Sequence, residues 1–284
     1  MNEKILKTKS NGFAALFFIV LMIIVAIASF ISSIAFLKNE ALAVVGVLLS
    51  IFLFIGSIIS FGGLKVVKPQ EAIVLTLFGD YTGTIKEPGF YFVNPFSVAV
   101  NPASKTKLGQ SGDVDRQNTP IAVGNSGIEA NLDAFKKHIS LKIMTLNNSR
   151  QKINDCLGNP VEIGIAVTWK VVDTAKAVFN VDNYKEYLSL QCDSALRNIV
   201  RIYPYDVAPN VDTTGDGIAD EGSLRGSSEV VAKRIRDEIQ ARVENAGLEI
   251  IEARITYLAY APEIAAVMLQ RQQASAIIDA RMMI

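Results

Sequence analysis

The chain has 284 residues, half of them hydrophobic, and its 28 basic and 28 acidic residues give a formal net charge of zero. Because it has no net positive charge and no basic run, we expect no binding to nucleic acid. Its two cysteines, Cys156 and Cys192, are too few for a disulfide framework and lack the spacing of a zinc site.

Two long apolar runs lie near the N-terminus, Phe13–Leu37 and Ala41–Phe61, with only Lys38–Glu40 between them. As helices they would be roughly 37 and 31 Å long, enough for the hydrocarbon core of a bilayer, which is about 30 Å thick. Backbone groups in a bilayer have no water to bind, so a spanning segment must be helical. The sequence therefore predicts a transmembrane helical hairpin over residues 13–61.

A cleaved signal peptide is the main alternative, because a basic leader precedes the first run and Ala26–Ala28 resembles a small-x-small cleavage site. The run continues past that site as far as Leu37, whereas a cleaved signal normally leads into a polar chain. A pair of buried core helices is the second alternative, but uncharged runs of this length are rare in soluble domains.

The distribution of lysines predicts the orientation of the hairpin in the membrane. The N-terminal flank, residues 1–12, has three, the turn has Lys38 alone, and Lys65 and Lys68 follow the second run. By the positive-inside rule, both ends of the hairpin are expected in the cytoplasm.

A membrane-proximal β subdomain is predicted over residues 62–100. Two short strands fall within Leu64–Phe78 and a third at Phe90–Val93, with turns at Gly79–Gly83 and Glu87–Gly89. Residues 101–137, rich in Gly, Ser and Asn, predict an irregular insertion with room for a short hairpin.

An α+β core is predicted over residues 138–260. The clearest strand is Val161–Val171, where apolar residues alternate with polar or small ones and Trp169 lies on the buried face. A strand at His138–Leu146, two helices and a final strand complete a mixed sheet with helices on one side. The helices are predicted from Tyr184 to near Pro204 and from a Ser227 or Ser228 cap to Gly247, and the last strand at Leu248–Leu258.

Several short motifs occur in an order that resembles the SPFH superfamily, which includes stomatins, prohibitins, flotillins and the bacterial HflK and HflC proteins. They are Val67–Ala72, Phe78-Gly79, Glu87–Phe90, Asn94–Phe96, Asn159–Val161, Ala195–Arg197, Gly247–Ile250, Ala261–Ile264 and Arg271–Ala274. The resemblance implies ring- or cage-like homo-oligomers at a bacterial-type cell (inner) membrane, with membrane proteases as partners of some members.

No catalytic or cofactor motif occurs in the sequence: it has no Gly-x-Ser-x-Gly elbow, phosphate loop, His-Glu-x-x-His or Cys-x-x-Cys. We expect no enzyme activity and no cofactor or metal. Within the acidic loop 209–226, the cluster Asp212–Asp220 has calcium-like spacing. Thr and Ser replace expected ligands there, so a solvated loop is preferred and calcium stays the alternative.

The C-terminal segment 261–284 predicts a helix, the start of a coiled coil that the natural chain could continue. Its apolar residues form two lines about 200° apart, which suits a helix with copies of itself on both sides. A helix packed within its own domain is the alternative. The candidate oligomer contacts are Ile264, Val267, Leu269, Arg271, Ala276 and Ile278.

The resemblance, taken with the predicted hairpin and C-terminal helix, implies a membrane-anchored oligomeric scaffold that contacts the lipid bilayer and organises microdomains or membrane-protein partners. A membrane-tethered hydrolase and a channel component are the alternatives. The first would need a nucleophile–base pair, and the second a polar pathway that two nearly uncharged helices do not offer.

Overall fold

The computed structural model describes residues 2–6, 10–35, 40–106, 137–148, 150–206 and 222–282. The chain divides into two compact units, the first made of residues 1–104, 129–142 and 174–179, and the second of residues 105–128, 143–173 and 180–284. Most of the predicted insertion, the acidic loop from 207 to 221 with its calcium alternative, and the tip of the hairpin lie outside the described residues.

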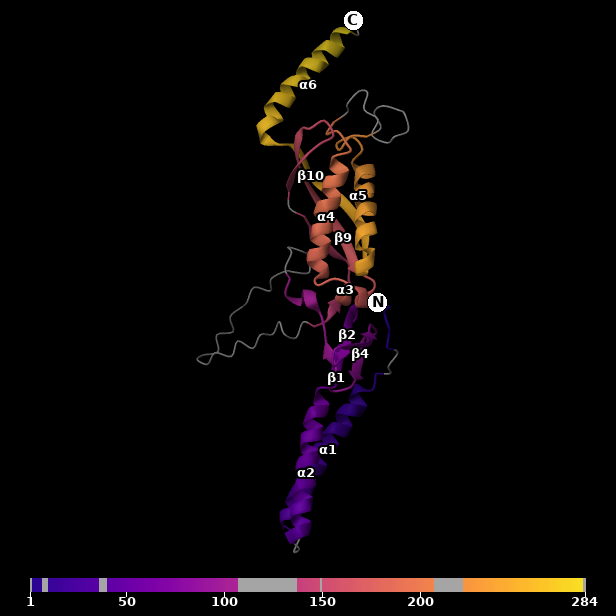
Figure 1. Ribbon diagram of the computed structural model, residues 1–284, viewed down its shortest axis with the longest axis vertical. Helices are drawn as coiled ribbons and strands as arrows, with labels where there is room; N and C mark the ends of the chain where they lie inside the picture. Colours follow the sequence, from indigo (N-terminus) through magenta and orange to yellow (C-terminus); the bar gives the residue numbers. More distant parts are fainter. Residues whose placement is uncertain are drawn as a thin grey trace, which may run out of the picture. The chain divides into compact units, whose positions relative to one another are not determined.

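The first unit begins with the predicted hairpin, in which α1 (Gly12–Ala35) and α2 (Glu40–Phe61) lie side by side (Figure 1). Small residues line the seam between the helices, as close packing in a membrane requires. Ser50 and Ser57 are buried there, and each hydroxyl donates to a carbonyl oxygen of its own helix at 2.7 Å. The buried residues of α1 recur every seven positions: Gly12, Ile19, Ala26 and Ser33.

A small β subdomain follows α2. The strands β3, β2 and β5 form one sheet, β6 pairs with β2, and β1 pairs with β4, all antiparallel. The strands are β1 (Leu64–Val67), β2 (Glu71–Leu77), β3 (Asp80–Ile85), β4 (Gly89–Phe92), β5 (Val98–Ala99) and β6 (Ile139–Ser140). Their core contains Val67, Ile73, Leu75, Ile85 and Tyr91, and the short helix α3 (Thr174–Phe179) packs against β2.

The predicted turn at Gly79–Gly83 is wrong, because most of it is strand β3. Phe78 and Gly79, with φ of 50° and 99°, complete the reversal by themselves, so the chain re-enters the sheet at Asp80. Gly83 lies within the strand, opposite Leu75. Because glycine is uncommon in strands, the sequence pattern did not predict β3.

The second unit contains a sheet in the order β10-β9-β7, with β8 also paired to β9. Its strands are β7 (Met144–Asn147), β8 (Gln151–Asn154), β9 (Pro160–Val171) and β10 (Leu248–Tyr260). The alternation predicted for β9 is confirmed, with Trp169 fully buried. The fold class is confirmed too, but the sheet is antiparallel in the described residues rather than mixed.

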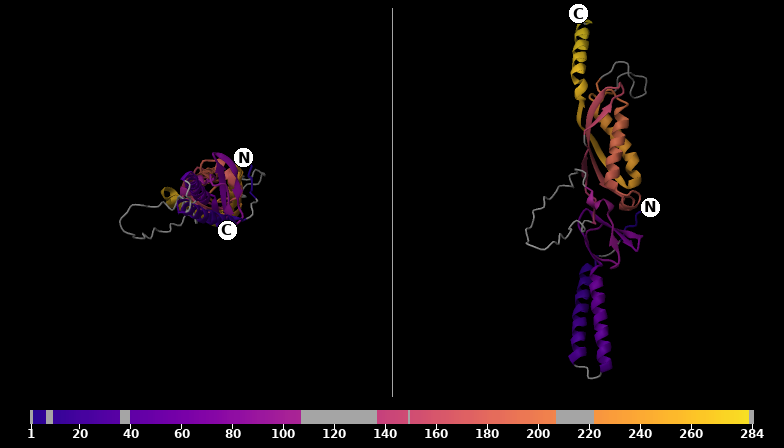
Figure 2. Two further views of the ribbon diagram at one scale, coloured as in Figure 1. Left: turned by 90° about the horizontal axis from the view of Figure 1, so that it is seen from below. Right: turned by 60° about the vertical axis from the view of Figure 1, so that its left-hand side comes forward.

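The two long helices of the second unit, which lie between β9 and β10 in the sequence, explain the antiparallel pairing. Helix α4 (Tyr184–Val200) and α5 (Ser228–Val243) pack against each other on one face of the sheet (Figure 2). The hydroxyl of Tyr187, near the start of α4, donates to the carbonyl oxygen of Arg242, near the end of α5, at 3.0 Å. The chain therefore reverses at each helix and enters β10 running opposite to β9.

The caps of these helices differ from each other. The side chain of Asn183 accepts from the backbone N–H groups of Lys185 and Glu186, as helix N-caps do. Ser227, predicted as a cap, makes no side-chain cap hydrogen bond to α5. The predicted buried face of α5 is confirmed at Val231, Ile235, Ile239 and Val243.

Candidate functional site: the membrane anchor, the docked N-terminus and the C-terminal helix

The outer surface of the hairpin is apolar and uncovered. Both helices are long and apolar enough to cross a membrane, and only 11% of the most apolar window of each is buried. A core helix of a soluble protein would be mostly buried. Large side chains such as Phe17, Leu48 and Phe52 point away from the partner helix. This surface is compatible with lipid and not with water.

The N-terminal flank is docked on the β subdomain. Residues Asn2–Leu6, which we call the N-terminal strap, meet the outer edge of β3 in a parallel bridge between Ile5 and Thr84. The N–H of Thr84 donates to the carbonyl oxygen of Lys4 at 2.8 Å, and the N–H of Leu6 donates to that of Thr84 at 2.9 Å. The strap thus occupies part of a strand edge that would otherwise be open.

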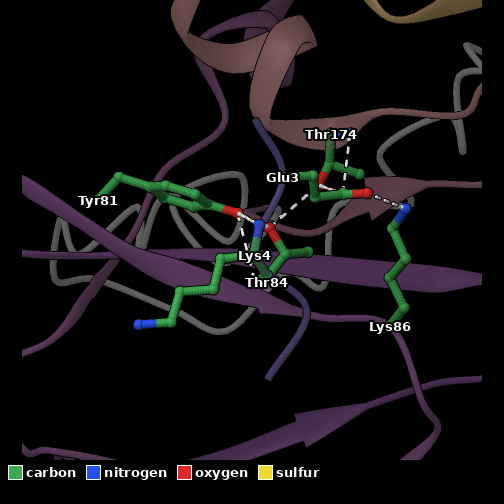
Figure 3. A network of polar contacts seen from close by, with 6 residues as sticks. All are labelled: Glu3, Lys4, Tyr81, Thr84, Lys86 and Thr174. Carbon is green, nitrogen blue, oxygen red and sulfur yellow. Dashed lines mark hydrogen bonds and ion pairs between the residues drawn. The ribbon is translucent and has the colours of Figure 1, made fainter. Parts of the chain in front are cut away.

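Glu3 ties the strap to two further elements (Figure 3). One carboxylate oxygen accepts from the backbone N–H of Thr174 at 3.0 Å and also from its hydroxyl, while the other pairs with the ammonium of Lys86 at 2.6 Å. The Glu3 side chain is only 12% exposed, so these charge-assisted contacts replace most of its hydration. Glu3 therefore joins the strap to α3 and to the residue after β3.

The hydroxyls around Glu3 form a continuous network. The buried hydroxyl oxygen of Thr174 lies 3.1 Å from that of Thr84, which in turn lies 2.8 Å from the Tyr81 hydroxyl. That hydroxyl accepts from the backbone N–H of Lys4 at 3.2 Å (Figure 3). Each polar group in this network has a partner, as buried polar groups require.

The strap is also part of the hydrophobic core. The side chain of Leu6 packs against the core of the β subdomain. A Cβ on Gly83 would lie 2.6 Å from Leu6 Cγ and 3.0 Å from the Lys4 carbonyl oxygen, so only glycine admits the strap at this distance. The strap precedes α1, and β1 directly follows α2. Both ends of the hairpin therefore lie next to the β subdomain.

The N-terminal sequence itself does not signal this docking. The basic flank predicted a charge bias only, and Glu3, its single acid, gave no indication of a partner. The one usable signal was Gly83 within an otherwise strand-forming segment, which can mark a close backbone approach.

The candidate oligomer contacts lie on one helix, α6 (Pro262–Met282), which begins at Pro262 as predicted. Val267, Leu269 and Ile278 are exposed, and Ile264 is half-buried beside the helix start. The side chains of Arg271 and Ala276 lie outside the described set. Lys152, on β8, pairs with Glu263 at 2.5 Å, and this contact lowers the pKa of that carboxyl.

The reactive groups of the described residues do not assemble into a catalytic site. Burial raises the pKa of the Cys192 thiol to about 12, and burial with the Asp155 charge raises that of the exposed Cys156, so both favour the unreactive thiol form. His138, the only histidine, contacts the Glu71 carboxylate at 2.8 Å. Within the described ranges no group of three or more His, Cys, Asp or Glu could hold a metal ion.

A polar cluster and two grooves complete the surface of the second unit. Asp193 accepts from the side-chain amides of Asn148 and Gln151, and Arg197 donates to the Gln151 amide oxygen at 3.1 Å. One groove, of about 530 Å³, lies between α5 and β10, and another, of about 560 Å³, is lined by residues such as Arg150 and Tyr257. Neither groove is lined by a Cys or His side chain that could act as a nucleophile or base.

These features define a class of protein: an α+β domain carried on an apolar helical hairpin, with surfaces suited to binding. The model of the SPFH domain / Band 7 family matches residues 65–283, so the chain belongs to this family. A comparison with curated proteins gave no significant match. Members of the family are generally membrane-associated, scaffold-like and not enzymes.

Proposed function

We propose that this protein is a membrane-anchored homo-oligomeric scaffold that organises membrane microdomains or regulates membrane-protein partners, a membrane protease among the candidates. The hairpin serves as the anchor, and the soluble residues form the assembly and partner-binding part. No step of this function requires a cofactor or a metal.

The observation that carries the proposal is the exposure of apolar residues on α6. Val267 and Leu269 are two positions apart, which places them on opposite sides of the helix, and both are exposed. A helix that served only its own domain would bury one apolar face. Copies of α6 on both sides would cover the two faces, and a repeated head-to-tail contact of this kind gives a ring when the rotation between neighbouring copies closes.

The proposed location is the inner membrane of a bacterial-type cell, with the soluble part in the cytoplasm. The lysine bias supports this orientation. Docking of the strap on β3 supports the same-side placement of the two ends, because the strap reaches β3 only from the side on which the β subdomain lies. The hairpin would then cross the membrane twice.

The two alternatives receive less support. A membrane-tethered hydrolase needs an activated nucleophile, and the thiols and the histidine of the described residues offer none. A channel component needs a polar path through the bilayer, whereas the outward surface of both helices is apolar.

The experiment is a mass measurement of the protein in a mild detergent, made on the parent and on a variant with Leu269→Asp and Ile278→Asp. We expect the parent to form a large oligomer and the variant to form small species, because each substitution places a charge on an apolar contact. Circular dichroism and membrane extraction should show that the variant remains folded and inserted.

A matched control is Gln270→Asp with Gln273→Asp, which adds the same two charges to exposed polar positions of the same helix. This control should assemble as the parent does. A fully assembled Leu269/Ile278 variant would show that α6 is not the assembly element, and a monomeric parent would reject the oligomeric scaffold itself.

A further inference from the structure

Two phenylalanine side chains of the β subdomain are held out in solvent against each other. Phe78 is 88% exposed and Phe96 is 57% exposed. Their rings stack with centroids 6.2 Å apart and planes 26° from parallel. A contiguous exposed aromatic pair on a folded domain marks an interaction surface more often than an isolated exposed side chain does.

The backbone fixes both rings in place. Phe78 occupies the left-handed region, with φ of 50°, at the reversal between β2 and β3. A residue with a Cβ adopts this conformation at an energetic cost, so the projection of its ring is built into the turn. Asn94 holds the second ring, because its side-chain oxygen accepts from the Phe96 N–H at 3.0 Å and its carbonyl oxygen accepts from the Ser97 N–H at 2.9 Å.

The pair lies beside the point where the chain leaves α2. A Cβ on Gly62, the residue after that helix, would lie 3.3 Å from the carbonyl oxygen of Pro95, which precedes Phe96. The N–H of Val93 donates to the carbonyl oxygen of Gly63 at 2.9 Å. The exposed rings therefore adjoin the apolar surface of the hairpin and extend it onto the β subdomain.

We propose that Phe78 and Phe96 form an interfacial anchor that inserts into the headgroup region of the leaflet next to the end of α2. Phe rings at a membrane surface bury their apolar faces at the boundary between headgroups and acyl chains, while the backbone that carries them remains in a polar environment. Asp80, exposed two residues after Phe78, limits the depth because a carboxylate keeps its hydration. The inference rests on the membrane-spanning hairpin of the proposed function.

The anchor would fix the orientation of the β subdomain at the bilayer surface. The strap and the end of α2 tie the hairpin to the subdomain, and a contact of the two rings with lipid would add a further point that holds this face of the subdomain against the bilayer. In an oligomer this contact would place the same face of every copy against the membrane.

The test uses tryptophan fluorescence of the full-length protein in phospholipid vesicles that contain brominated lipids, which quench tryptophan at known depths. Phe78→Trp and Phe96→Trp each add a reporter, and the parent supplies the background because Trp169 is fully buried. We expect bromine near the top of the acyl chain to quench the added emission more than bromine near the terminal methyl. Leu190→Trp, at an exposed position on α4, should not be quenched.

A variant in the hairpin distinguishes failure of the interfacial anchor from failure of the membrane-spanning hairpin on which it rests. Phe52→Trp lies on the exposed face of α2 and should be quenched by the deeply placed bromine. If the Phe52 variant is quenched and both the Phe78 and Phe96 variants are not, the interfacial anchor is rejected while the membrane-spanning hairpin is supported. If the Phe52 variant is also unquenched, the membrane anchoring fails together with the inference.

Discussion

Glu3 accepts a hydrogen bond from the backbone N–H of Thr174 at 3.0 Å, although the two residues are 171 positions apart in the chain. The contact joins the segment that precedes the membrane hairpin to α3, a short helix between β9 and α4 in the sequence. The N-terminal flank is therefore a structural part of the β subdomain.

Glu3→Ala should destabilise the β subdomain by about 1–3 kcal/mol, because the substitution removes the carboxylate that accepts from the Thr174 N–H and pairs with the Lys86 ammonium. Thermal unfolding in detergent should show a transition lowered by a few degrees. Glu87→Ala, which removes an exposed carboxylate nearby, should melt as the parent does. Equal melting of the two variants would mean that the Glu3 contacts contribute nothing.

Gly83→Ala should release the strap while leaving the pairing of β2 and β3 in place, because the new Cβ would overlap Leu6 and approach the Lys4 carbonyl oxygen. Hydrogen exchange should become faster at the amides of Leu6 and Thr84, whose hydrogen bonds hold the strap. Gly79→Ala is the matched control, since Gly79 also has a positive φ, of 99°, but a Cβ there meets nothing within 4 Å. Unchanged protection in the Gly83 variant would contradict the close approach.

Cysteine labelling in intact cells should report the topology. An impermeant maleimide is expected to modify an Asn39→Cys variant from outside and to leave Cys156, which is exposed on the soluble part, unmodified until the cells are permeabilised. The expectation follows from the lysine bias and from the strap, which requires both ends of the hairpin on one side. Labelling of Cys156 in intact cells would place the soluble part outside.

Cys192 should resist alkylation in the folded protein at every pH up to the alkaline range. Burial raises the pKa of its thiol to about 12, above the usual 9.0, so the folded state keeps the proton where an unfolded chain loses it. Its ionisation in the unfolded chain lowers stability as the pH rises above about 9. Mass spectrometry after iodoacetamide treatment at pH 8 should show one modified cysteine, Cys156, and two in denaturant. Modification of Cys192 in the native protein would show that the α4 core opens.

The sequence by itself determined the elements that depend on local periodicity and composition. An uncharged run of more than twenty residues has few alternatives to a membrane helix, which is why α1 and α2 were predicted. Strict alternation likewise identified β9 and placed Trp169 in the core. The C-terminal helix α6 and its start at Pro262 were predicted in the same way, whereas its contacts with other copies stay a prediction.

Only the tertiary structure decided which distant residues meet. Glu3 with Thr174, and Phe78 with Phe96, are brought together by strand register and by the turn between β2 and β3, and neither is encoded in the residues next to them. Strand β3 was missed for the same reason. Gly83 reads as a turn residue in isolation, whereas its absent side chain is required because the N-terminal strap passes over it. Such requirements arise from long-range packing, which a local pattern does not contain.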